Sequence, residues 1–179
     1  MRMWLIMLGV FLAAGIGILA RREGPWKHPE ASLPWKHAQP VVQPIAFNHK
    51  RHLAEGLSCK DCHKRAETGP HATIPPVKAC MLCHSEAKGT DPEEAKVRAF
   101  AEAGHDIPWI QVNRLPGHVY FSHAAHVGYA KMDCAECHGD MKDRTEPVTV
   151  SQIGHLTMDR CMTCHQSKGV SLDCLRCHK

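Results

Sequence analysis

The feature that most constrains this chain is the pattern Cys-x-x-Cys-His, which occurs five times and uses all ten cysteines. Two thiols at this spacing can each add to one vinyl group of a porphyrin, and the imidazole that follows reaches the iron. The pattern is the attachment signature of c-type haem and predicts five covalently bound haem c groups. The cysteine pairs are Cys59 and Cys62, Cys80 and Cys83, Cys134 and Cys137, Cys161 and Cys164, and Cys174 and Cys177, and the predicted proximal iron ligands are His63, His84, His138, His165 and His178.

Two other uses of paired cysteines compete with haem attachment. Cysteine pairs at this spacing also bind structural zinc, and secreted proteins use even numbers of cysteines for disulfides. Neither use requires a histidine directly after the second cysteine, yet all five copies have one. Haem attachment is therefore the interpretation that accounts for the whole pattern.

The composition agrees with an interior filled by cofactors. Only 44% of the residues are hydrophobic and 6% are aromatic, and part of them lies in one N-terminal run. The remaining chain can bury little protein core, so porphyrins would supply the missing apolar interior and would lie close together. We interpret the formal net charge of +4 as counter-charge for haem propionates, and we expect no nucleic-acid binding.

Residues 1–22 are predicted to form an N-terminal transmembrane signal anchor. Residues 3–20 are an apolar run without a charge, and a helix of that length, about 27 Å, just spans a bilayer core. A cleaved signal peptide is the alternative, although the run exceeds a usual signal core and no clear small-x-small site ends it. Because c-type haem is attached outside the cytoplasm, we expect a cytoplasmic-membrane protein with a single span and a periplasmic haem domain.

Residues 23–46 are predicted to form a periplasmic linker, and residues 47–179 the pentahaem domain. The linker is rich in proline and contains Pro-Trp-Lys-His twice, ending at His28 and His37. Such a sequence favours extended backbone. Trp26 and Trp35 are candidates for the membrane interface, and the two histidines either bind an iron or bind nothing.

An internal repeat organises the haem domain. Phe-x-His-x-x-His precedes the first motif and again the third, and the cysteines follow the histidines at nearly equal distances in the two copies. Two histidines three residues apart project from one helix face, one turn from each other, and can reach two different irons. Each half of the chain can therefore complete two six-coordinate haems. The predicted distal ligands are His49, His52, His123 and His126.

The fifth motif, Cys174 to His178, has no such repeat beside it. Its haem, or another displaced by ligand exchange, must take its sixth ligand from elsewhere in the chain. A methionine ligand would raise the reduction potential relative to two histidines. The candidates are His71, His105, His118, His155 and Met158.

One longer helix is predicted between the two halves. Asp91 can cap its first turn, two glutamates follow a proline there, and Gly104 ends it. Val97, Phe100 and Ala101 share one face, which indicates packing. Elsewhere we expect short helices at the haem-binding segments, long connections and almost no sheet.

The repeat followed by Cys-x-x-Cys-His resembles the class III multihaem cytochromes c, those of the cytochrome c3 and c7 kind. Three longer stretches, Ile74 to His84, Ile107 to His126 and Leu156 to His165, resemble the pentahaem subunit of alternative complex III. The resemblance implies a mostly α fold with much irregular structure, built from duplicated dihaem halves and one extra haem, after one N-terminal transmembrane helix. Met158 stands at the family's Leu-Thr-Met position, which favours it as the fifth distal ligand.

The resemblance also implies a function. The chain would be an electron carrier rather than an enzyme by itself, and a subunit of a membrane-bound menaquinol oxidoreductase that delivers electrons to a periplasmic acceptor or terminal oxidase. Its expected partners are an iron–sulfur protein, multi-span quinol-binding subunits and another cytochrome c subunit. A stand-alone anchored quinol dehydrogenase of the NapC-like kind and a multihaem reductase are the alternatives. The reductase would need a five-coordinate haem, often with lysine in place of the motif's histidine, and none of the motifs has that change.

The five motifs predict the haem content directly. The purified protein should contain five haem c groups per polypeptide, all six-coordinate and low-spin. Pyridine haem quantitation of the dithionite-reduced protein measures the number, and the ferric spectrum measures the spin state. A smaller number, or a high-spin ferric signal, would contradict this prediction.

Overall fold

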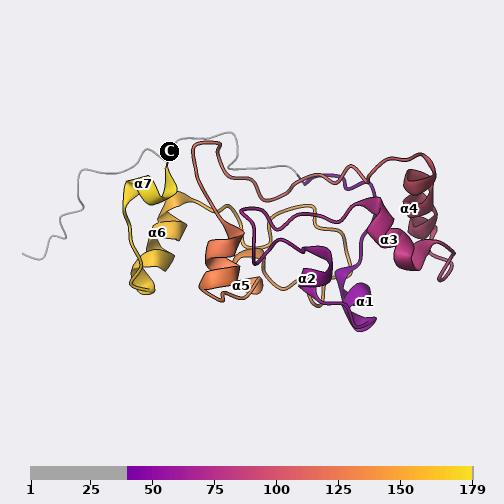
Figure 1. The fold of residues 1–179 in the computed structure, drawn as a ribbon, viewed down its shortest axis with the longest axis horizontal. Coiled ribbons are helices and arrows are strands. Elements are labelled where there is room, and N and C mark those ends of the chain that lie inside the picture. Colours follow the sequence, from indigo (N-terminus) through magenta and orange to yellow (C-terminus); the bar gives the residue numbers. More distant parts are fainter. Residues whose placement is uncertain (1–39, 179) are drawn as a thin grey trace, which may run out of the picture. The chain divides into compact units, whose positions relative to one another are not determined.

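The computed structural model describes residues 40–178, where short helices are joined by long irregular segments (Figure 1). The predicted anchor, residues 1–22, and the linker residues Trp26, His28, Trp35 and His37 lie outside the described residues. Within residues 40–178, none of the helices has the length and apolar character needed to cross a membrane. The elements are α1 (His49–Ala54), α2 (Cys59–Cys62), α3 (Val77–His84), α4 (Pro92–Glu102), the π-helix η2 (Ala124–Tyr129), α5 (Ala135–His138), α6 (Met158–Ser167) and α7 (Cys174–Cys177).

The prediction of a mostly helical and irregular fold is confirmed. Residues 40–178 contain no strand, and the β-pairing found there is a single antiparallel bridge between Val119 and His178. Every Cys-x-x-Cys-His motif overlaps a helix. Regular structure therefore concentrates where the haem attachment signatures lie.

Helix α4 forms as its sequence predicts. The Asp91 side chain accepts a hydrogen bond from the backbone N–H of Glu93 at 3.0 Å, and Pro92 occupies the first turn. Acidic residues in that turn favour the positive end of the helix dipole. Gly104 follows the helix with a φ of 71°, a left-handed conformation that glycine adopts at little cost.

A small protein core lies between α3 and α4, which pack side by side (Figure 1). Ile45, Val77 and Ile107 are its buried members. The α4 face predicted to pack does so, and the residues around the core are Cys80, Val97, Phe100, Ala101 and Trp109. Such a core is too small to stabilise a domain of this size alone, so most of the apolar interior must come from another source.

The helix beside the Phe-x-His-x-x-His segment differs between the two halves: it is α1 in the first half and the π-helix η2 in the second. The second copy has one more residue than the first between its histidines and the following motif. The extra residue is accommodated in η2, where the N–H of Ala130 donates to the carbonyl of Ala125 at 3.0 Å, which is the wider hydrogen-bonding pattern of a π-helix. A single inserted residue commonly converts a helical turn to this wider form. The histidines therefore keep their place relative to the preceding phenylalanine, while the cysteines shift by one position along the chain.

Helix η2 lies directly against the loop that follows the first motif. The N–H of His123 donates to the carbonyl of Pro70 at 3.1 Å, and that of Ala124 donates to Gly69 at 2.9 Å. Gly128 is part of the same contact, because a Cβ there would overlap the carbonyl oxygen of Glu67. The close approach of the two segments requires a glycine at this position.

Replacing Gly128 with alanine should destabilise the protein by about 1 to 3 kcal/mol, since backbone on both sides must shift to relieve the overlap. The control is Gly89→Ala, where the new Cβ meets nothing closer than 3.9 Å and only the ends of side chains. Thermal unfolding followed by circular dichroism measures both variants. Equal midpoints for the two would contradict the close contact between η2 and the first motif.

Candidate haem-binding sites

Each Cys-x-x-Cys-His motif is presented on one face of a helical turn. Because residues three apart share a helix face, both thiols of a motif project in the same direction. The N–H of His63 donates to the carbonyl of Cys59 at 2.8 Å, and His138 and His178 make the equivalent bond at 2.9 Å. In the second and fourth motifs the whole pattern lies within α3 and α6. The histidine therefore stands one turn beyond the first cysteine in every motif.

Polar side chains cap the N-termini of two of these short helices. Ser58 and Asp61 form a capping box before α2, in which the Ser58 N–H donates to the Asp61 carboxylate at 2.6 Å. Hydrogen bonds from the Ser58 hydroxyl and N–H hold the pKa of Asp61 below its usual value. Asp173 caps α7 by accepting from the N–H of Leu175 at 3.0 Å. Local capping thus fixes the turns that carry the first and fifth motifs.

The two Phe-x-His-x-x-His segments have the same local geometry. Phe47 meets the ring of His49 edge-on at 4.8 Å between ring centres and stacks on His52 at 4.3 Å. In the second copy the corresponding distances, from Phe121, are 4.9 Å and 4.5 Å. The phenylalanine thus orients both histidines of its segment, which explains its place in the repeat.

Four motif histidines face a second histidine. The distances between ring centres are 6.0 Å for His52 and His84, 6.3 Å for His123 and His138, 6.0 Å for His126 and His165, and 5.6 Å for His118 and His178. An imidazole nitrogen binds a metal at about 2 Å and lies about 1 Å from its ring centre, so two imidazoles on opposite sides of one metal are about 6 Å apart. The observed spacing fits one iron between each pair.

His49 is the candidate partner of His63 in the first motif. Burial, followed by the nearby His63, His52 and Arg144, lowers the pKa of His49 to about 4. The ring is therefore neutral at pH 7, which is the form that binds a metal. Its Nδ1 is buried and has no hydrogen-bond partner among the described residues.

The fifth motif lies next to His118, which is one of the candidates for its sixth ligand that the sequence offered. The rings of His118 and His178 are nearly parallel, at an interplanar angle of 18°, with their centres 5.6 Å apart. The Tyr120 N–H donates to the Cys177 carbonyl at 2.7 Å. Met158 begins α6 and is 55% exposed. The other candidates, His71, His105 and His155, are exposed, and so is His118, so it is the contact with His178 that distinguishes His118 from them. The structure thus favours His118 over Met158 as the partner of His178.

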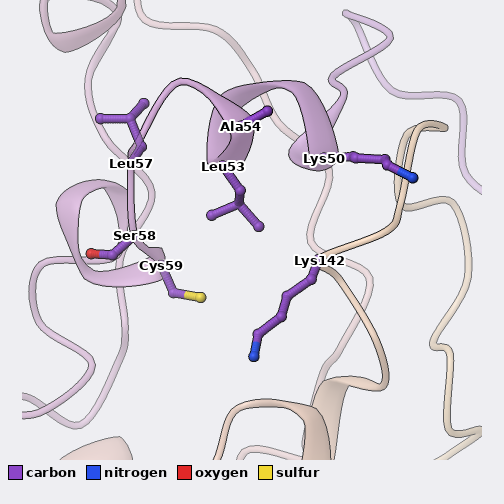
Figure 2. A pocket seen from close by; sticks show the side chains of 7 residues that line it. All are labelled: Lys50, Leu53, Ala54, Leu57, Ser58, Cys59 and Lys142. Atoms are coloured by element: carbon purple, nitrogen blue, oxygen red, sulfur yellow. The ribbon is translucent and has the colours of Figure 1, made fainter.

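The surroundings of the cysteines suit porphyrins with propionates. A pocket of about 460 Å³ lies beside Cys59, with Leu53, Ala54 and Leu57 as its apolar wall. Lys50 and Lys142 also line it, and the Lys50 ammonium pairs with Asp143 at 3.0 Å. Figure 2 shows Leu53, Cys59 and Lys142 projecting into the same space from α1, α2 and the segment after α5.

A second pocket has the same character. Its volume is about 340 Å³, and it lies beside Cys62 among Ile74, Pro75 and Leu82, with two further lysines in its lining. An apolar wall with basic groups at the edge is what a flat apolar ring bearing carboxylates requires. The lining of both pockets therefore has the chemical character of a haem site.

Half of these ten imidazoles are oriented by their second nitrogen. Nδ1 lies within hydrogen-bond distance of a backbone carbonyl in five cases, and metal-binding histidines generally donate in this way. The acceptors are Asn48 for His52 (2.8 Å), Thr73 for His63 (2.7 Å), Pro70 for His123 (3.0 Å), Ser122 for His126 (2.9 Å) and Ser171 for His165 (3.2 Å). Thr73 adopts a φ of 68°, a conformation that a β-branched residue rarely takes.

The motifs lie next to one another in the order second, first, third, fourth, fifth. Burial raises the pKa of one thiol at each junction, and a nearby thiol of the adjacent motif raises it further. These neighbours are Cys80 and Cys62, Cys134 and Cys59, Cys137 and Cys164, and Cys161 and Cys177. Backbone bonds agree: besides the contact of η2 with the first loop, Lys50 donates to the carbonyl of Arg144, beyond the third motif, at 2.9 Å.

Two polar residues near the motif histidines were missed by the sequence interpretation. The Asn113 amide lies 3.2 Å from Nδ1 of His138, and a carboxylate oxygen of Glu94 lies 4.0 Å from Nδ1 of His84. Asn113 belongs to the stretch Ile107 to His126, which carried the family resemblance, and that was its available signal. Glu94 was interpreted only as a residue of the first turn of α4.

Two family models of cytochromes c match the chain. Residues 26–111 match the model described as the class III cytochrome C family, and residues 119–179 match that of cytochrome c7 and related cytochrome c. The chain is also similar to a protein named menaquinone reductase, multiheme cytochrome c subunit, of Nitratidesulfovibrio vulgaris (strain Hildenborough). The two are 33% identical over 87% of this chain and 83% of that protein.

Proposed function

Since the chain belongs to the class III, cytochrome c7-like family of multihaem cytochromes c, we propose that it is the pentahaem electron-transfer subunit of a membrane-bound menaquinol oxidoreductase, alternative complex III. In this proposal residues 1–22 anchor the chain in the cytoplasmic membrane. The haem domain faces the periplasm and passes electrons to a periplasmic acceptor or a terminal oxidase. The chain acts as a carrier within the complex and is not an enzyme by itself.

The observation that supports electron transfer most directly is the facing of histidines. Every motif histidine has a second histidine near it, four of them with ring centres 5.6 to 6.3 Å apart. Haem iron with two imidazole ligands carries one electron and keeps no open position for a substrate. This argues for a carrier and against a multihaem reductase.

The proposed ligands follow the observed pairs. His49 and His52, one turn apart on α1, would serve the first and second motifs, and His123 and His126, at the start of η2, would serve the third and fourth. For the fifth motif we propose His118 in place of Met158. The backbone supports this choice, because the bridge between Val119 and His178 fixes the neighbour of His118 against the motif itself.

The order of the motifs supports conduction along the chain. The attachment cysteines of adjacent motifs are neighbours, so groups bound to them would lie close together in a row. The second motif is at one end of this row and the fifth is at the other. Partner subunits would meet the chain near these ends, and the expected partners are an iron–sulfur protein, quinol-binding membrane subunits and a further cytochrome c subunit.

A second candidate function comes from the related protein. Its name, menaquinone reductase, favours a complex in which electrons run toward menaquinone rather than away from menaquinol. The same row of sites would serve either direction. Menaquinol oxidation and menaquinone reduction by the isolated complex distinguish the two candidates.

The ligand proposal predicts different outcomes for two variants. His118→Ala should convert one ferric haem from low-spin to high-spin, because an imidazole ligand is lost. Met158→Leu should leave the five reduction potentials unchanged. Electron paramagnetic resonance and a redox titration measure these outcomes; a lowered potential in Met158→Leu with an unchanged spectrum in His118→Ala would instead assign the fifth ligand to Met158.

The assignment to a complex is tested on native membranes. The chain, solubilised in mild detergent and captured by a C-terminal tag, should be recovered with an iron–sulfur protein and multi-span subunits. High-salt washing without detergent should leave it in the membrane fraction if residues 1–22 are retained as an anchor. Recovery of the chain alone would overturn the proposal and favour the NapC-like alternative.

A further inference from the structure

The helix α4 brings a carboxylate behind one proximal histidine. A Glu94 carboxylate oxygen lies 4.0 Å from Nδ1 of His84, and the two side chains are 12% and 21% exposed. Glu94 is in the first turn of α4, and His84 ends α3, so the packing of these two helices sets their approach. The pair therefore lies where these two helices pack together.

The second nitrogen of His84 lacks the hydrogen bond that half of the paired histidines make. Five motif or distal histidines have a backbone carbonyl within hydrogen-bond distance of Nδ1, whereas Nδ1 of His84 is buried and has no hydrogen-bond partner. A histidine that binds iron through Nε2 generally donates its Nδ1 proton to an oxygen nearby. A movement of about 1 Å brings the Glu94 oxygen into bonding distance.

Other contacts hold the carboxylate in place. The N–H of Lys88 donates to Glu94 Oε2 at 2.7 Å. The guanidinium of Arg98 lies 3.8 Å from the same oxygen, and its Nη1 is buried without a hydrogen bond. Glu94 is thus held by the backbone of the segment before α4, and its charge is partly balanced by Arg98 of the same helix.

We propose that Glu94 is a positioning residue that accepts the Nδ1 proton of His84 and thereby lowers the reduction potential of the haem bound at the second motif. A carboxylate behind the imidazole makes it a stronger donor to iron and adds negative charge nearby, and both effects stabilise the ferric state. The inference rests on the proposed function, because it requires His84 to be a haem ligand. It makes the second motif the low-potential end of the row.

The decisive variant is Glu94→Gln, studied in the intact complex or the full-length holoprotein. It should favour reduction of one haem by about tenfold, equivalent to about 59 mV for a one-electron couple, and leave the other four unchanged. Glu93→Gln is the matched control, since it removes the same charge from the same turn, where Glu93 pairs with Lys96 and accepts from the N–H of Ala46. A redox titration measures both variants.

A third variant tests the direction in which charge near His84 shifts the reduction potential. Arg98→Gln leaves the Glu94 charge unopposed and should shift the same haem's potential downward. Electron paramagnetic resonance of the ferric proteins should show five low-spin haems throughout, with one signal altered in Glu94→Gln.

The outcomes separate this inference from the proposed function. Five low-spin haems with unchanged potentials in Glu94→Gln, or equal shifts in Glu93→Gln, would overturn the role of Glu94 alone. A high-spin haem in the unaltered protein would instead count against the ligand set itself.

Discussion

The interaction on which the rest of the fold depends is the pairing of imidazoles at the distance expected for two ligands of one metal ion. Four histidine pairs have this spacing, and their members come from segments as far apart as His118 and His178. Only Ile45, Ala66, Val77 and Ile107 form the buried hydrophobic core among the described residues, so side-chain packing alone does not account for these approaches. Iron and porphyrin would therefore be structural as well as functional, because the binding free energy of a metal site contributes to folding.

The repeat shows how closely the position of the histidines relative to their phenylalanine is maintained. The second copy has gained a residue between its histidines and the next motif, yet its phenylalanine lies 4.9 Å and 4.5 Å from the two histidine rings, against 4.8 Å and 4.3 Å in the first copy. The widened turn of η2 takes up the added residue and leaves the histidines in place. A change in chain length was thus absorbed in the local helix type.

The sequence predicted those features that depend on local spacing. The helical turns at the motifs, the capping of α4 by Asp91 and the mostly helical character follow from neighbouring residues, and the structure contains them. The partner of His178 did not follow, because His118 is distant from it along the chain. The family resemblance favoured Met158, and His118 was one of four alternative histidines. The placement of the first motif beside the third also escaped prediction, since the repeat suggested two self-contained halves. Such long-range contacts depend on backbone bonds, such as that from Lys50 to Arg144, which no local pattern encodes.

The protein core and the electrostatics of the second motif have a common origin. Cys80 packs against the core, and Phe47 connects that region to the repeat by stacking on His52 and meeting Trp109 edge-on at 6.1 Å. Three of the four buried hydrophobic residues of the described chain lie here, and a charge in such surroundings acts more strongly than one at the surface. Elsewhere in the described chain, the groups that contact Nδ1 of the paired histidines are backbone carbonyls or an amide, which have no net charge. A carboxylate therefore has its greatest influence beside His84, and a single helix, α4, provides both the apolar packing and the charge.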